Sequence, residues 1–441
     1  MLKFGYDFYN NDTWEVLRPN GVLNQENADG RVFKLHLPPW WGKLLSRINL
    51  DFEVRSVEDL SGKELTTKWV YLLEPLGDPY GWLGYEQEWL DSSDQYGKKI
   101  IDSLFSGISE TALKSVRNDK AIICIWHAQE APNINHVGKN LFEEFHKELK
   151  LKNINPSNFV FVNGNLKTKS QYKYWKRNSE YNDQKDIHII EFSSWRHIDY
   201  LKRWKLANFD ENKIVKKKFL CFNRSLVHPH RLVMIIMLYE RNLLSSGMVS
   251  FDKIQEDFHF KSLSGNLKHH FKFGWKLIDK KLKTLKKLAV LSPSVVDVDE
   301  WETNHMITSY EWPYEQTFFS LVSETNFVQD TIFLTEKIWK AIANKHPFII
   351  AGNPGVIRYL RQEGFKTYHP YIDESYDEIK NPYRRMVKIV DEVERLSQMN
   401  DKEIKSFLTK IKYIAEHNYE KLIKEDNLIN KVFNELMEIT K

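Results

Sequence analysis

The most informative charged residues lie between residues 318 and 368. An apolar run there predicts a strand that ends at Glu324, and a helix is predicted to begin with Thr335, Glu336 and Lys337. Thr is a favoured N-cap and Glu336 suits the positive end of a helix dipole, whereas Lys337 does not. A cation at that position often accompanies an anion that the free N–H groups also attract. The pattern therefore indicates an anion-binding site, although an ordinary exposed helix start has the same residues.

A second group of polar residues follows the strand-like run KKKFLCFN. The strand is predicted to end at Asn223, a loop with Arg224 follows, and Arg231 lies in the first turn of an apolar helix. The planar fork of an arginine beyond a strand's carboxyl end can hold two phosphate oxygens at once. Arg231 is the better candidate for a phosphate contact and Arg224 the second, and we place Asn223 in the same site. A surface arginine at a helix start is the alternative interpretation.

A third group, in the first half of the chain, could transfer protons. The apolar run AIICIW is followed directly by His127 and, three residues later, by Glu130. An imidazole or a carboxylate in such a loop can act as a general base. Glu74 and Asp78 are further candidates, and a loop carboxylate without a catalytic role is the alternative interpretation of Glu130.

Two patterns point to other chemistry. Asp297 and Asp299 form a DxD tripeptide of the kind that can hold Mn²⁺ against a diphosphate, but such tripeptides arise readily by chance, so we expect no metal. Basic residues between 269 and 287 could follow a nucleic-acid backbone, but they are also typical of a solvated helix face. No P-loop, GxGxxG, HExxH or GxSxG motif occurs, so kinase, simple dehydrogenase, metalloprotease and hydrolase functions lose their usual support.

The order of these residues resembles the donor-binding signature of the α1,3-fucosyltransferases and related GT-B glycosyltransferases, a group that includes phage and large-virus proteins. The resemblance rests on an acidic residue after a strand (Glu324), the triplet TEK at a helix start, a tryptophan in that helix, and an apolar strand followed by Gly. It implies that Glu336 binds the ribose of a nucleotide sugar, that Lys337 and Arg231 bind its diphosphate, and that Glu324 belongs to the same site. Thr325 replaces the family's asparagine, a departure that concerns the identity of the sugar.

The same resemblance implies a reaction. In that family a glutamate after a strand of the first domain is the base, which makes Glu130 the expected base here and His127 an alternative or an acceptor contact. We expect a metal-independent, inverting transfer of a hexosyl or fucosyl group from a nucleotide-diphosphate sugar to a hydroxyl, with a saccharide as acceptor and no cofactor. The alternatives are a glycosyltransferase that acts on modified bases of DNA, and a non-catalytic protein that binds sugar nucleotides or glycans.

These residues need elements to position them, and strand-like and helix-like segments alternate along the chain. The predicted strands are residues 69–73, 121–126, 159–162, 187–192, 219–222, 288–291, 317–322 and 347–350. The predicted helices are residues 138–149, 230–243, 336–343 and 356–363. The alternation predicts α/β domains with parallel sheets, whose ligands bind beyond the carboxyl ends of the strands.

The charged stretch around residues 200–216 separates two such sets of segments. We predict an acceptor-binding domain over residues 1–205 and a nucleotide-sugar-binding domain over residues 206–375, two Rossmann-like domains that face each other across a GT-B-like cleft. Residues 376–441 have a purely helical pattern and are expected to pack across both domains.

The composition fits an ordinary globular protein: the 441 residues are 42% hydrophobic and 28% charged, with a net charge of +4. Residues 201–300 hold 20 basic and 10 acidic residues, a local excess that suits a phosphate-bearing ligand or a solvated basic face. Two cysteines in apolar runs, Cys124 and Cys221, are expected to be buried and unpaired. With no signal-peptide pattern and no apolar run long enough to span a bilayer, we expect a cytoplasmic protein.

Overall fold

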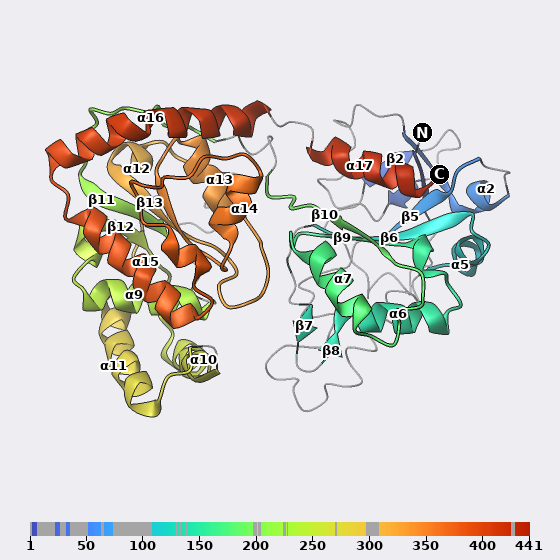
Figure 1. The fold of residues 1–441 in the computed structure, drawn as a ribbon, viewed down its shortest axis with the longest axis horizontal. Coiled ribbons are helices and arrows are strands. Elements are labelled where there is room, and N and C mark those ends of the chain that lie inside the picture. Colours follow the sequence, from blue (N-terminus) through green and yellow to red (C-terminus); the bar gives the residue numbers. More distant parts are fainter. Residues whose placement is uncertain are drawn as a thin grey trace. The chain divides into compact units, whose positions relative to one another are not determined.

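The computed structural model describes residues 2–6, 23–26, 32–35, 52–62, 66–73, 108–128, 131, 134–136, 139–196, 201, 204–223, 226, 228–269, 271–296, 308–424 and 428–441. The chain forms two compact units (Figure 1). The first unit contains Met1–Ser194 and Asn427–Lys441, and the second contains Trp195–Asp426. The C-terminal segment therefore returns to the unit in which the chain begins.

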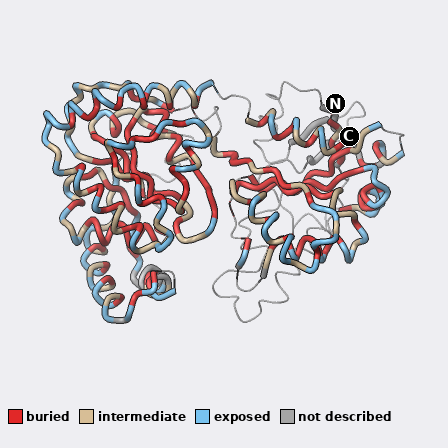
Figure 2. The backbone as a smooth tube through the Cα atoms, viewed as in Figure 1, coloured by how far each residue is buried: buried red, intermediate tan, exposed pale blue. Residues whose placement is uncertain are grey.

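The first unit is built on a six-stranded parallel sheet in the order β10-β9-β6-β5-β1-β4. Its strands are β1 (Leu2–Tyr6), β4 (Phe52–Ser56), β5 (Trp69–Leu73), β6 (Ala121–His127), β9 (Phe159–Asn163) and β10 (His188–Glu191). Two antiparallel pairs lie outside this sheet, β2 (Leu23–Glu26) with β3 (Val32–Leu35) and β7 (Asn135–His136) with β8 (Lys139–Asn140). All described residues of β6 and β9 are buried, as expected for central parallel strands (Figure 2).

Helices cover both faces of this sheet. One core includes side chains of α2 (Val57–Ser61), α5 (Glu110–Arg117), α6 (Leu141–Leu151) and α7 (Thr168–Arg177). The opposite core is closed by α17 (Leu428–Ile439), whose Phe433 meets Phe4 of β1 edge to face at 5.9 Å. The last helix of the chain therefore completes the first unit.

The second unit has a four-stranded parallel sheet in the order β12-β11-β13-β14. Its strands are β11 (Lys217–Phe222), β12 (Gly247–Ser250), β13 (Thr317–Ser323) and β14 (Phe348–Ala351). Its helices are α9 (Pro229–Glu240), α10 (Glu256–His269), α11 (Trp275–Leu291), α12 (Trp312–Glu315), α13 (Glu336–Ala343), α14 (Val356–Gln362), α15 (Pro382–Ser397) and α16 (Asp401–Lys424). A Cβ on Gly247 would come within 2.5 Å of the Phe219 ring, so this close pairing of β12 with β11 requires glycine.

Most of the predicted elements are confirmed, and one predicted strand is wrong. Residues 288–291 are the last turn of α11, because Leu285 and Leu288 bury one face of that helix while Val290 and Leu291 are exposed. The sequence did not reveal β1, β4 or β12. Two α/β units with parallel sheets and a helical C-terminal segment confirm the predicted fold class, and the cleft between facing domains stays a prediction.

The first segment of unit 1 ends at Ser194, whereas the predicted boundary between the two domains was residue 205. Of the C-terminal helices, α15 packs on β11, β14 and α9, and α16 packs on α13, whereas α17 belongs to the first unit. The acceptor and donor roles that we assigned to the two domains stay predictions.

Candidate functional site

The carboxyl end of β13 carries a fully buried carboxylate, that of Glu324. Its backbone N–H extends the sheet by donating to Ala351 O at 3.0 Å. Its side chain accepts from the N–H of Thr335 at 3.2 and 3.3 Å, and Oε2 also accepts from the Thr335 hydroxyl at 2.6 Å. Glu324 therefore closes the loop between β13 and α13 and has no exposed surface left for a ligand.

Thr335 occupies the predicted N-cap position of α13, but its side chain makes no capping hydrogen bond. The hydroxyl instead donates to Glu324 and accepts from Lys337 Nζ at 3.0 Å. The same ammonium lies 3.4 Å from Thr325 Oγ1 and 3.2 Å from Glu336 Oε1. The side chains of Lys337 and Glu336 are 23% and 16% exposed, so a cation and a carboxylate are fixed at the surface of the helix start.

The start of α9 lies against this group. His230 places Nε2 2.8 Å from the backbone oxygen of Glu324, and its ring stacks on Phe327. Arg231, one residue further along α9, is buried. Asn223, at the end of β11, is also buried and directs Nδ2 toward Arg231 O at 3.4 Å. Residues predicted from two distant motifs thus meet at the carboxyl ends of neighbouring strands.

The charges in this group respond to one another. Burial raises the pKa of Glu324, and Lys337 opposes that rise. Burial also favours the neutral form of Glu336, but Lys337 and Lys340 outweigh it, so its pKa falls and it stays ionised. Burial lowers the pKa of Arg231, and Glu336 and Glu324 oppose that fall. Two cations and two carboxylates therefore form one electrostatic cluster, defined here as Arg231, Lys337, Glu324 and Glu336.

Three buried oxygens at the same edge of the sheet have no hydrogen-bond partner among the residues that the structure describes. They are Asn223 Oδ1 after β11, Ser323 Oγ at the end of β13, and Asn353 Oδ1 after β14. Buried polar atoms are nearly always paired with protein, water or ligand. This edge is therefore suited to hydrogen-bonding water or a polar ligand, and strand ends were the only sequence signal for it.

A neighbouring helix start is already filled by the protein itself. Asp377 accepts from the backbone N–H groups of Gly355, Ile357 and Arg358 at 3.0 to 3.1 Å. This carboxylate occupies the position that an anion would take at the start of α14. The cluster at α13 and α9 is thus the better anion site.

The predicted proton-transfer residues belong to the other unit. His127 ends β6, is buried, and pairs in register with Asn163 of β9. Glu130 lies outside the described residues, as do Arg224, Asp297, Asp299, Glu74 and Asp78. The structure thus brings together the predicted donor residues Asn223, Arg231, Glu324, Glu336 and Lys337, while the role of His127 stays a prediction.

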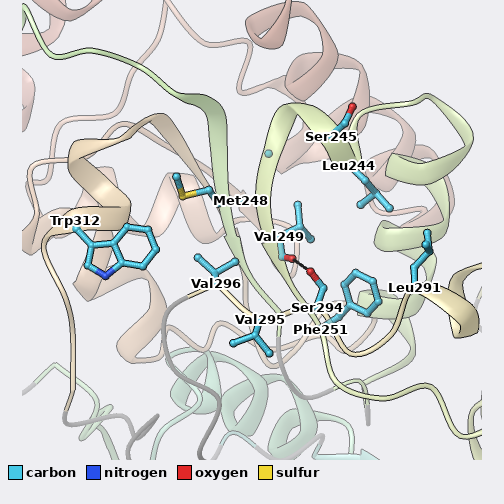
Figure 3. Close-up of a pocket in the computed structure, with 11 residues that line it drawn as sticks. Leu244, Ser245, Met248, Val249, Phe251, Leu291, Ser294, Val295, Val296 and Trp312 are labelled. Atoms are coloured by element: carbon cyan, nitrogen blue, oxygen red, sulfur yellow. Dashed lines mark hydrogen bonds between the residues drawn. The ribbon is translucent and has the colours of Figure 1, made fainter.

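A pocket of about 480 Å³ lies beside β12, the edge strand of the second sheet (Figure 3), and no residue of the charged cluster is among its described lining residues. None of its described lining residues is ionisable; they are Leu244, Ser245, Gly247, Met248, Val249, Phe251, Leu291, Ser294, Val295, Val296 and Trp312. A site for a diphosphate usually offers cations, and the described lining of this pocket includes none. The charged cluster is therefore the better candidate site for a diphosphate.

Other predicted features have plain structural roles in the described part of the chain. Cys124 and Cys221 are buried and unpaired, and burial raises the pKa of both thiols, that of Cys221 to about 12. Lys281 of the basic helix α11 is buried against Glu240. Within the described ranges, no cluster of three or more metal-ligating side chains occurs, and no helix is long and apolar enough to cross a membrane.

No protein-family model and no curated protein matches this chain. Among solved structures, it is similar to a UDP-forming α,α-trehalose-phosphate synthase from Burkholderia vietnamiensis, with a TM-score of 0.37 and 10% identity over 80% of each chain. It is also similar to an α,α-trehalose 6-phosphate synthase from Burkholderia multivorans, with a TM-score of 0.35 and 10% identity over 90% of this chain and 76% of the other. Likenesses of this size establish neither a shared family nor a function.

Proposed function

We propose that the chain is a glycosyltransferase whose second unit binds a nucleotide-diphosphate sugar. One observation carries the proposal: the ends of two neighbouring strands position a cation each. Asn223, after β11, contacts the backbone of Arg231, and Glu324, after β13, holds Thr335, which in turn holds Lys337. The carboxyl ends of parallel strands are where open α/β sheets bind ligands. Two positioned cations there suit a diphosphate.

In the reaction that we propose, the acceptor hydroxyl attacks the anomeric carbon while the bond from that carbon to the diphosphate oxygen breaks. Arg231 and Lys337 offset the charge that develops on the leaving diphosphate, as preorganised cations do in other transfers. Glu336, kept ionised by Lys337 and Lys340, accepts hydrogen bonds from the ribose. Glu130, or His127 in its place, takes the proton of the acceptor hydroxyl.

Glu324 has a supporting role in this proposal. Its carboxylate is fully used by Thr335, so it acts on the donor by fixing Thr335 and, through that hydroxyl, Lys337. We propose that the transferred sugar is a hexosyl or fucosyl group and that the acceptor is a saccharide. We also propose that the transfer is metal-independent and inverting.

The test is the release of nucleoside diphosphate from GDP-, UDP-, CDP-, ADP- and dTDP-sugars in EDTA, with oligosaccharide or DNA as acceptor. We expect turnover of one donor class, and a loss of kcat/KM in Lys337→Ala but not in Lys402→Ala, which removes an exposed lysine from the first turn of α16. Activity on DNA that falls steeply with salt would favour the DNA-modifying alternative. Binding of a donor without any turnover would favour the non-catalytic one.

A further inference from the structure

His228 is an unassigned imidazole at the edge of the charged cluster. It is the N-cap residue of α9, but its side chain makes no capping hydrogen bond. The residue is half-buried, and its ring lies 5.9 Å from that of His230. Within the described part of the chain, neither ring nitrogen of His228 forms a hydrogen bond. One nitrogen of the neutral imidazole can therefore donate to a ligand and the other can accept.

The surroundings of His228 are those of the proposed diphosphate site. The N–H of Arg231 donates to His228 O at 3.0 Å, which fixes the backbone of the two residues in one turn. His230 joins the same turn to Glu324, and Glu324 is joined through Thr335 to Lys337. Burial, Arg231 and Lys337 together lower the pKa of His228 to about 3, so the ring is neutral at pH 7 and its charge does not add to that of the cations.

We propose that His228 is a third contact for the diphosphate, and that its ring N–H donates to an oxygen of the group that Arg231 and Lys337 also hold. The inference rests on the proposed function and names a binding residue that the sequence motifs did not assign. A neutral donor is suited to this place, because Arg231 and Lys337 already repel a further positive charge.

Calorimetric titration of the full chain tests this with GDP, UDP, CDP, ADP, dTDP, their nucleosides and inorganic pyrophosphate. We expect His228→Ala to weaken binding of the preferred diphosphate and of pyrophosphate by about tenfold, the loss of one hydrogen bond to a charged group. Binding of the matching nucleoside should not change. His228→Gln, which keeps an N–H donor, should recover part of the affinity, and His269→Ala in α10 is the matched control.

The outcomes separate the two proposals. Equal diphosphate affinity in wild type, His228→Ala and His228→Gln would overturn the role of His228 and leave the proposed function intact. Equal losses for nucleoside and diphosphate would also overturn it, because they indicate a general structural effect. If wild type binds no diphosphate and no pyrophosphate, the proposed function fails and this inference fails with it.

Discussion

Replacing Thr335 with valine removes the hydroxyl that joins Glu324 to Lys337 and preserves the shape of the side chain. That hydroxyl donates to the buried carboxylate at 2.6 Å, while the N–H of residue 335 remains as a donor at 3.2 Å. A hydrogen bond to a charged group contributes about 1.5–3 kcal/mol, so we expect Thr335→Val to lower the free energy of unfolding by about 2 kcal/mol at pH 7. Urea unfolding followed by far-UV circular dichroism measures the change.

The pH dependence has a definite sign. Burial raises the folded-state pKa of Glu324, and losing the Thr335 hydroxyl raises it further, because that bond favours the ionised carboxylate. The folded variant then binds the proton more tightly than folded wild type. The cost of the substitution is therefore complete above both folded-state pKa values and shrinks as pH falls through them. We expect a smaller difference in unfolding free energy at pH 5 than at pH 7.

Two controls accompany this prediction. Thr335→Ser keeps the hydroxyl and should retain most of the stability, and Thr409→Val removes a hydroxyl that only bonds Lys405 O on the exposed face of α16. Surface substitutions usually change the free energy of unfolding by no more than about 0.5 kcal/mol. A Thr335→Val cost of that size at pH 7, or the same cost at both pH values, would refute the reasoning.

Three further predictions concern other parts of the chain. Phe433→Ala removes a fully buried ring that faces Phe4, and should cost about 3–5 kcal/mol of unfolding free energy; a cost below that of a surface substitution would mean that α17 does not complete the first unit. Asp377→Ala leaves the N–H groups of Ile357 and Arg358 without their acceptor, while that of Gly355 keeps the backbone oxygen of residue 377, and should cost about 1–2 kcal/mol in the same urea assay, whereas Asp377→Asn should cost less. Glu130→Gln should lower kcat by about 10²–10⁴-fold with the Kd for nucleoside diphosphate unchanged, and an unaltered kcat would remove Glu130 as the base.

The sequence predicts elements well where local pattern and burial agree. Residues 336–343 have a capping residue, a helical apolar face and a strand after them, and α13 has those bounds. Residues 288–291 look like a strand because the end of α11 is apolar even on its exposed side. β12 is four residues long and begins with Gly247, so its strand character depends on pairing with β11, which local sequence does not contain.

The contacts of the candidate site between residues close in sequence could be predicted, and those between distant segments could not. Glu336 and Lys337 are adjacent, and their pairing follows from the helix start. The contact of Glu324 with Thr335 spans a loop, and the start of α9 contacts the beginning of that loop through His230 and the backbone oxygen of Glu324, a long-range contact that local sequence does not contain. The approach of His230 and its neighbour His228 to Glu324 depends on the strand order β11-β13, which brings separate motifs to one edge of the sheet.

A thermal-shift panel tests most directly whether Lys337 and its neighbours bind a diphosphate without a metal. GDP, UDP, CDP, ADP and dTDP would be added to wild type, Lys337→Ala and Lys402→Ala, in EDTA and in Mn²⁺. A ligand that binds only the folded state raises Tm in proportion to the logarithm of its concentration over Kd. We predict that one diphosphate raises the Tm of wild type and Lys402→Ala in EDTA and leaves that of Lys337→Ala unchanged. No shift with any diphosphate, an equal shift in Lys337→Ala, or a shift that requires Mn²⁺ would contradict the claim.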